Sequence, residues 1–263
     1  HSAQGFGVSH KNTELTMLMP ASADSTNVYP YNYEITVAGA TNPAIRQRMV
    51  WIGEHSIPFK NASVLKLLGE FHYVSANSKD ASKVYPADKG WVIGAKYNNP
   101  FKTKLPGSFN QLSARYGAGI ANGGDNGNTF TWATYGAPDE DGKYKNAYSF
   151  TMVEHFLLNL SQKFSINGYG VYTKSKGGSA STNTDEYFNG NQLYNQKTDF
   201  VVGFRGFYYV TKWLHLIEEV HYAVRKDGDN PDANMWKFSF APTIVPLGKK
   251  DPWSRPHIRL VYT

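Results

Sequence analysis

Apolar and polar residues alternate along most of this chain with the two-residue period of β-strands, and the 3.6-residue period of helices is nearly absent. Clusters of Gly, Asn, Asp and Pro separate the alternating segments, as turns between strands require. Many segments reach the roughly 9 to 11 residues that a tilted strand needs to cross a bilayer. The pattern predicts strands at residues 12–20, 32–39, 45–53, 63–76, 90–98, 109–118, 128–135, 147–159, 163–173, 199–211, 214–225, 235–245 and 256–263.

The links between these segments come in two sizes. Tight links occur at 160–162 and 212–213, whereas long polar links cover 118–128, 174–198 and 226–234. Short turns that alternate with long polar loops are typical of an outer-membrane β-barrel. A soluble β-sandwich with irregular loops gives a similar pattern, so it is the alternative fold.

The two faces of the predicted strands differ in chemistry. In 199–211, Val202 and Phe204 lie on an apolar face, and Arg205 lies on the other face. In 214–225, Glu219 lies on the polar face, but Glu218 falls on the apolar one. A soluble protein buries the apolar face, whereas a barrel in lipid turns it outward and lines a polar lumen with the other. The polar face also carries large aromatic residues, which favours the barrel.

The composition excludes several classes of protein. Hydrophobic residues make up 41% and charged residues 18%, and no segment approaches the roughly 18 to 20 consecutive apolar residues of a transmembrane helix. There is no cysteine, which excludes a disulfide framework and a thiolate metal site. The net charge is +6, but Lys and Arg are scattered, so we expect no nucleic-acid partner. The chain begins without an initiator Met or a signal peptide, as a processed chain or a fragment would.

The sequence contains no recognisable catalytic constellation. Glu154–His155 and Glu218–Glu219 are adjacent pairs, and adjacent side chains of a strand point to opposite faces, so neither pair can cooperate directly. A nucleophile elbow, a metalloprotease motif and a phosphate-binding glycine loop are all absent from the sequence. We therefore expect no enzyme and no cofactor.

One acidic loop is a weak candidate for a metal site. Asp227, Asp229 and Asp232 offer the oxygen ligands that calcium prefers. The loop lacks the spacing and the downstream Glu of an EF-hand, and a solvated hairpin loop is the simpler explanation. No other metal site is expected.

Sugar contact is a more specific hypothesis. Phe109 and Trp253 each start a predicted strand, and each shares its face with an arginine six residues later, Arg115 and Arg259 respectively. At about 3.3 Å per residue this separation is roughly 20 Å. An aromatic side chain packs on the apolar face of a sugar ring, and charged side chains bind its hydroxyl rim. A belt of aromatic residues facing lipid is the alternative, and the spacing alone does not decide between them.

Several segments resemble one known family. W-S-R-P-H-I-R-L-V-Y-T, at the end of the chain, resembles the late-strand signature of the maltoporin family of bacterial sugar porins. The order of the segments is that of the family and covers nearly the whole chain, and this shared order carries the resemblance. The other segments are A-Q-G-F-G-V-S-H-K-N-T-E-L-T, D-K-G-W-V-I-G-A-K-Y, G-S-F-N-Q-L-S-A-R-Y, F-V-V-G-F-R-G-F-Y-Y-V-T-K-W, E-V-H-Y and K-F-S-F-A-P.

The resemblance implies a homotrimeric transmembrane β-barrel of about eighteen antiparallel strands. It also implies that maltodextrins pass along a slide of aromatic residues, to which Trp253 and Phe109 would belong. The alternation of residues, and not the resemblance, supplies four further polar candidates for the lumen. These are Arg115, Arg205, Glu219 and Arg259.

The chain also departs from the family. Its start aligns beyond the family's constriction loop and its end lies before the last strand, so we expect one β-barrel domain over residues 1–263 that is part of a larger barrel. A smaller closed barrel is the alternative, because an open sheet leaves unpaired edges in lipid. A further alternative is a non-native assembly of the fragment through these edges.

These observations together predict an outer-membrane sugar porin of a Gram-negative bacterium, with an oligosaccharide substrate, lipid contacts and a homotrimeric state. Maltodextrin, sucrose and β-glucoside channels all occur in the family, and the sequence does not choose among them. A general or ion-selective porin and a soluble β-sandwich carbohydrate-binding protein are the alternatives.

Overall fold

The chain is built from β-strands. The computed structural model describes residues 4–10, 13–19, 32–35, 44–76, 86–101, 106–122, 134–188 and 191–263, with side chains from residue 48 onward except 184–193. Among these residues no helix is long and apolar enough to span a membrane. The strands are β1 (Gln4–His10), β2 (Thr13–Met19), β3 (Asn32–Ile35), β4 (Ala44–Pro58), β5 (Val64–Val74), β6 (Asp88–Pro100), β7 (Phe109–Gly119), β8 (Tyr148–Ser161), β9 (Phe164–Lys176), β10 (Asn183–Phe188), β11 (Asn191–Tyr194), β12 (Gln196–Tyr209), β13 (Leu214–Asp227), β14 (Ala233–Ile244) and β15 (Ile258–Arg259).

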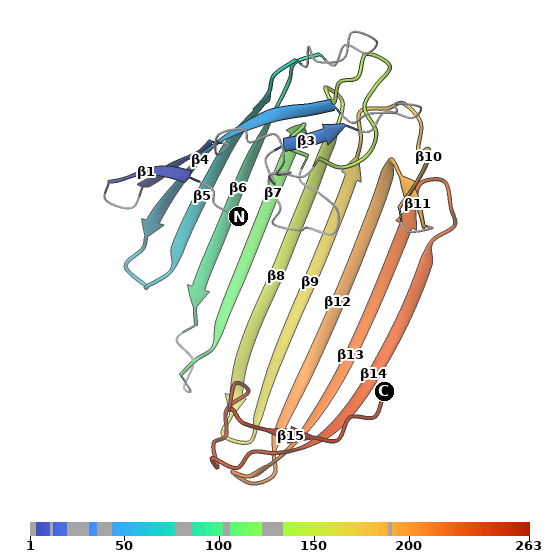
Figure 1. Ribbon diagram of the computed structural model, residues 1–263. Coiled ribbons are helices and arrows are strands. Elements are labelled where there is room, and N and C mark those ends of the chain that lie inside the picture. Colours follow the sequence, from blue (N-terminus) through green and yellow to red (C-terminus); the bar gives the residue numbers. More distant parts are fainter. Residues whose placement is uncertain are drawn as a thin grey trace.

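Most strands belong to one antiparallel sheet. It has 13 strands in the order β1-β2-β4-β5-β6-β7-β8-β9-β12-β13-β14-β15, with β3 paired to β4, and β10 and β11 form a separate hairpin. Figure 1 shows the strands side by side in one curved wall. Within the described residues β1 and β15 do not pair with each other, so this wall is open between them.

The central strands are long, and their register is continuous except for a shift at Asn159–Ser161 where β8 pairs with β9. β8, β12 and β13 each have 14 residues. β12 pairs with β13 without a shift from Lys197–Asp227 to Tyr209–His215. A slip of one residue would move every apolar side chain to the polar face, so the two-face pattern fixes this register.

Short and long links lie at opposite ends of the sheet. Residues 162–163 and 210–213 close hairpins at one end, whereas 120–147 and 177–195 link strands at the other, where β10 and β11 lie (Figure 1). Two of the three predicted long links therefore lie opposite the tight ones, whereas the third, predicted at 226–234, is the short link 228–232. One longer link, 245–257, lies at the short-link end, where the Val245 N–H donates to the Trp213 carbonyl at 2.7 Å.

The sequence located most of the strands but not their number or all of their ends. The predicted strand at 256–263 shrinks to β15 and an isolated bridge between Phe240 and Tyr262. Of the predicted strand at 128–135, residues 134–135 are not in a strand, and the rest lies outside the described residues. β1, β10 and β11 were not predicted, and β10 and β11 are short segments with few apolar residues.

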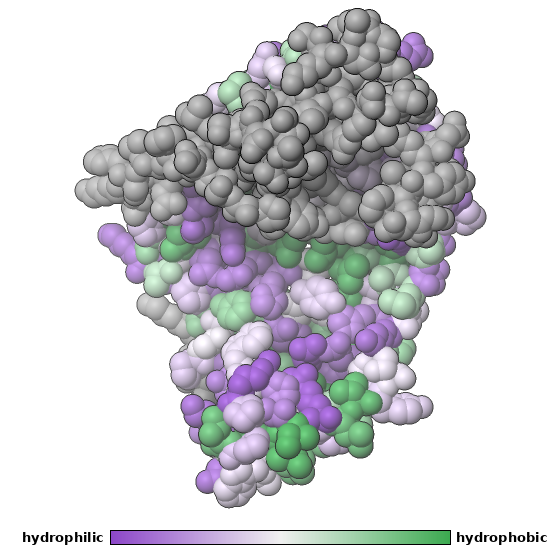
Figure 2. All heavy atoms as spheres, viewed as in Figure 1, coloured by the Kyte–Doolittle hydropathy of each residue, from purple (hydrophilic) through white to green (hydrophobic). Residues whose placement is uncertain are grey.

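The register confirms the two faces. Phe200, Phe204 and Tyr208 of β12 lie on the apolar face and are 40%, 42% and 47% exposed. Arg205, between them in sequence, lies on the other face opposite Glu219. The face seen in Figure 2 carries hydrophilic residues across its middle, with hydrophobic residues grouped lower down. A barrel turns the apolar face outward and the polar face to the lumen.

Two adjacent valines of β12 test these directions. Val202, on the apolar face, pairs with Tyr222, and Val201, on the polar face, pairs with Ala223. Val202→Arg should lower the free energy of unfolding by about 2–4 kcal/mol, because the guanidinium would enter lipid near the middle of the strand. Val201→Arg should cost clearly less, because its side chain would enter the lumen. Denaturant titration of the full-length protein in phospholipid vesicles measures the free energy of unfolding of both variants. Equal losses of stability would contradict the assignment of the two faces.

Candidate functional site

Two neighbouring rows of side chains cross the polar face from β7 to β14 and are together called the polar belt. The register pairs the members of each row strand by strand. The first row is Phe109, Leu157, Asn167, Arg205, Glu219 and Ser239, and the second is Gln111, His155, Tyr169, Gly203, His221 and Lys237.

The centre of the polar belt is a continuous chain of polar contacts. The Glu219 carboxylate accepts hydrogen bonds from the Arg205 guanidinium and from Nε2 of His221. Nδ1 of His221 then accepts a hydrogen bond from the Tyr169 hydroxyl at 2.7 Å. Both contacts of His221 are satisfied when its proton is on Nε2. The network holds four side chains from β9, β12 and β13 in one arrangement.

A glycine makes room for this arrangement. A Cβ atom on Gly203 would lie 2.5 Å from Nδ1 of His221 and 2.7 Å from Cε1 of Tyr169. The two rings approach each other over Gly203, with centroids 5.6 Å apart. Any other residue at this position would displace at least one of the two rings.

Phe109 lies at one end of the polar belt. Its ring meets that of His155 edge to face, with centroids 5.1 Å apart. Nε2 of His155 lies 2.9 Å from Nδ2 of Asn167, which also donates to the Phe156 carbonyl at 2.7 Å. Phe109 begins β7, as predicted, and it offers an apolar surface beside polar groups.

Of the four predicted polar lumen residues, three come together. The charges that act on the Arg259 guanidinium are those of Arg205, Arg255 and Glu219. Arg259 therefore lies within electrostatic range of the other three groups, whereas Glu219 itself is in contact with Arg205 and His221. Nε of Arg259 is buried and has no hydrogen-bond partner among the described residues.

Arg115 lies apart from the other three. It is on β7, opposite Gly94 of β6 and Thr151 of β8. Its Nε and Nη2 atoms are buried and have no hydrogen-bond partner in the described part of the chain. It shares a face with Phe109, as predicted, but it is six residues further along the strand.

The structure corrects the placement of Trp253. The sequence predicted that it starts a strand and shares a face with Arg259, whereas it lies in the link 245–257, before β15. Asp251 Oδ1 accepts the Trp253 N–H at 2.9 Å in a turn. Pro252 and Pro256 flank the residue, and proline supplies no N–H to a strand ladder, so the alternation of faces does not extend to it. Its side chain is 51% exposed, at the short-link end where Phe109 also lies.

The acidic loop does not gather its three carboxylates. Asp227 accepts a hydrogen bond from Nε of Arg225 at 2.7 Å, and Asp229 accepts one from the Thr182 hydroxyl. No group of three or more potential metal ligands occurs among the described side chains, which include Asp232.

The side chains within each adjacent pair, Glu154–His155 and Glu218–Glu219, point to opposite faces of the sheet, as predicted. His155 belongs to the polar belt, whereas Glu154 accepts a hydrogen bond from Asn110 on the apolar face. Glu219 faces the lumen, and Glu218 lines a depression of about 470 Å³ together with Phe204 and Phe238 of the apolar face.

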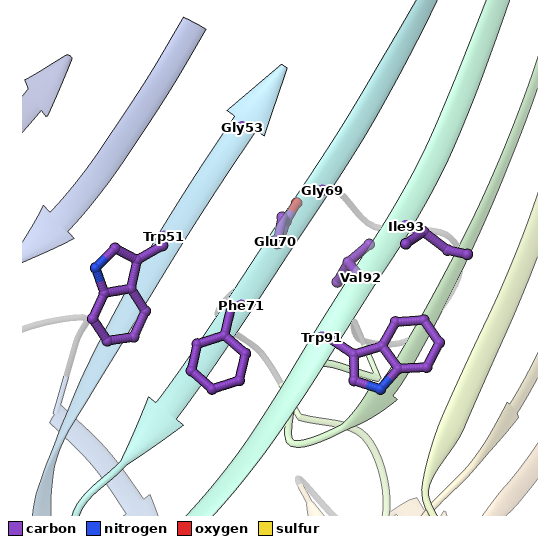
Figure 3. A pocket seen from close by; sticks show the side chains of 8 residues that line it. All are labelled: Trp51, Gly53, Gly69, Glu70, Phe71, Trp91, Val92 and Ile93. Carbon is purple, nitrogen blue, oxygen red and sulfur yellow. The ribbon is translucent and has the colours of Figure 1, made fainter. Parts of the chain in front are cut away.

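A second depression, also on the apolar face, lies away from the polar belt. Figure 3 shows Trp51, Phe71 and Trp91 beside one another on β4, β5 and β6. They form one row of the register, and Gly53 and Gly69 leave a hollow of about 560 Å³ next to them. On the outward face of a barrel these rings meet lipid, so this hollow is not a candidate sugar site.

Several members of the polar belt were not predicted from the sequence to be lumen residues. Tyr169, His155 and Asn167 lie on the polar face by simple alternation, which could have identified them as lumen residues. Their mutual contacts depend on the cross-strand register, which no single segment contains. The position of His221 beside Tyr169 is an example, because 52 residues separate the two in the chain.

Comparison with known proteins agrees with the fold and with the resemblance. No curated protein matches the chain. Among family models, the one described as LamB porin matches residues 1–263, the whole chain. LamB porins are outer-membrane channels of Gram-negative bacteria and are not a family of enzymes, and the antiparallel all-β fold is consistent with their barrel. The chain therefore belongs to the LamB porin family.

Proposed function

We propose that the protein is a sugar porin that lets maltodextrin-like oligosaccharides diffuse through its lumen. The observation that carries this proposal is the polar belt, in which Phe109 adjoins hydrogen-bonding groups that continue across six strands. Membership of the LamB porin family supports a channel in the outer membrane. We further propose that the protein acts as a homotrimer surrounded by outer-membrane lipid.

The chemistry of the polar belt suits a sugar. A pyranose ring has apolar C–H faces and a rim of hydroxyl groups that both donate and accept hydrogen bonds. Aromatic side chains such as Phe109 and Trp253 can pack on the faces. Arg205 can donate to hydroxyl groups, and Glu219 can accept from them. Each contact is shallow, so a sugar can bind and leave again, as transport by diffusion requires.

The geometry of a barrel also suits a linear substrate. The strands of a barrel are tilted to its axis, so a row that runs across the strands rises around the lumen. The polar belt is such a row, and an oligosaccharide in contact with it would advance along the axis as it follows the wall. Successive sugar units could then occupy successive positions on the belt.

An ion-selective porin without sugar affinity is the second candidate. It is favoured by the positive charge around Arg259, on which the guanidinium groups of Arg205 and Arg255 both act. Such a channel would prefer small anions, and sugars would pass without blocking the current.

Removal of the aromatic contacts tests sugar affinity. Trp253→Ala and Phe109→Ala should each weaken the block of single-channel current by maltohexaose about 3- to 10-fold, because each removes one ring that packs on a sugar face. Trp236→Ala is the control for Trp253, since Trp236 is 60% exposed on the apolar face. Leu112→Ala is the control for Phe109. Unchanged block in both aromatic variants would reassign these residues to packing.

The carboxylate of the polar belt provides a second test with an adjacent control. Glu219→Gln removes the charge that pairs with Arg205 and also acts on Arg259. The block by maltohexaose should weaken about 2- to 10-fold, and the reversal potential in a salt gradient should shift toward anion selectivity. Glu218→Gln removes the neighbouring charge on the outward face and should change neither quantity. Equal effects of the two substitutions would show that the polar belt does not line the ion pathway.

A further inference from the structure

Part of the link between β7 and β8 lies on the luminal face of the sheet. Gly117 shares the face of Phe109 and Arg115 on β7. A Cβ atom on Gly117 would lie 2.2 Å from the Ala121 carbonyl oxygen, and one on Gly90 would lie 2.4 Å from the Ala121 nitrogen. The two glycines therefore make room for residues 120–122 against the inner wall.

Residues 120–122 and 134–147, here called the inner segments, are well packed. Ile120, Tyr144 and Ala147 form a buried cluster with Val74 of β5. Nδ2 of Asn122 donates to the Tyr135 carbonyl at 2.8 Å and to the Lys176 carbonyl at 3.2 Å. The inner segments thus occupy space in the lumen near the end where the long links lie.

One guanidinium from β4 joins the two inner segments. Nη2 of Arg48 donates to the Ile120 carbonyl at 2.8 Å, and Nη1 donates to the Thr134 hydroxyl at 3.0 Å. The Thr134 hydroxyl in turn donates to the Ile120 carbonyl at 2.6 Å. Arg48 is 2% exposed, so these bonds form in a water-poor site where the loss of one partner is costly.

His72 also contacts Arg48, and this contact determines which ring nitrogen of His72 carries the proton. Nδ1 of His72 lies 2.5 Å from Nη2 of Arg48, and Nε2 lies 2.9 Å from Oε2 of Glu70. A guanidinium only donates, so Nδ1 must accept and the proton must be on Nε2, facing Glu70. The observed geometry therefore needs neutral His72.

A second proton on His72 would remove the contact. Nδ1–H would then face the Arg48 guanidinium, and two buried cations would be in contact. Within the described part of the chain, the charged groups that act on His72 are Arg48 from β4, Glu70 from its own strand and Arg115 from β7. β6 places only Gly90 opposite it, and the inner segments contribute the neutral Thr134 and Ile120 groups. Among the described residues, one carboxylate thus faces three cations after protonation.

We propose that Arg48 and neutral His72 are positioning residues that hold the inner segments against the barrel wall and so set the width of the lumen at the long-link end. Protonation of His72 loosens this attachment and widens the channel. The inference rests on the proposed channel function, because it assigns to these residues a role in conduction.

The test compares the pH profiles of single-channel conductance of the full-length protein between about pH 7.5 and about pH 4.5. The wild type should gain conductance about twofold or more on acidification. His72→Gln should abolish this gain, because an amide both accepts from Arg48 and donates to Glu70 at every pH. Arg48→Ala should show the wide, pH-independent channel throughout. His215→Gln, at a histidine 2% exposed at the short-link end, should keep the wild-type profile.

Thiol labelling provides a readout that is independent of conductance. These 263 residues contain no cysteine, so Ala121→Cys, at a residue 0% exposed, introduces their single thiol into an inner segment, and any cysteine elsewhere in the full-length protein is replaced by serine. At neutral pH the added Arg48→Ala substitution should accelerate labelling about tenfold or more, and added His215→Gln should not. Equal labelling rates, or a conductance profile that His72→Gln leaves unchanged, would overturn the proposal even when maltohexaose still blocks the channel. If the protein formed no channel at all, the proposed function would be overturned together with this proposal.

Discussion

Every backbone N–H and C=O group at membrane depth must find a partner within the protein, because lipid supplies none. This constraint explains the single antiparallel ladder that continues from β1 through β14, and the long unbroken pairing of strands such as β12 and β13. Once the ladder is fixed, side chains alternate between lipid and lumen. The chemistry of the lumen then follows from the position of each residue in the alternation.

The ladder also decides which lumen residues meet. Residues far apart in the chain, such as Tyr169 and His221, become neighbours because their strands are both paired to β12. A glycine on the strand between them provides the space for their contact. The same device recurs at Gly90 and Gly117, where glycines admit the inner segments to the luminal wall. Glycines at particular positions in the sheet therefore shape the lumen as much as the large side chains do.

The sequence predicted what depends on local periodicity. It located most strands, the two link sizes, and the faces of Phe109, Arg205 and Glu219. It misplaced Trp253, because two prolines interrupt the alternation from which its position was extrapolated. It could not predict the contacts of His221, or the joint role of Arg48 and His72, because both depend on register between strands. The grouping of Arg205 and Arg259, with Arg115 apart, likewise needed the structure.

The central claim is that the lumen binds sugar while it conducts. The most direct test is the current through single channels of the full-length protein in a planar bilayer, titrated with maltohexaose and, separately, with sucrose. The account predicts a reversible block that saturates with maltohexaose concentration, because the polar belt offers a limited number of contacts in sequence. Open channels whose current neither sugar reduces would contradict it and would leave an ion-selective porin.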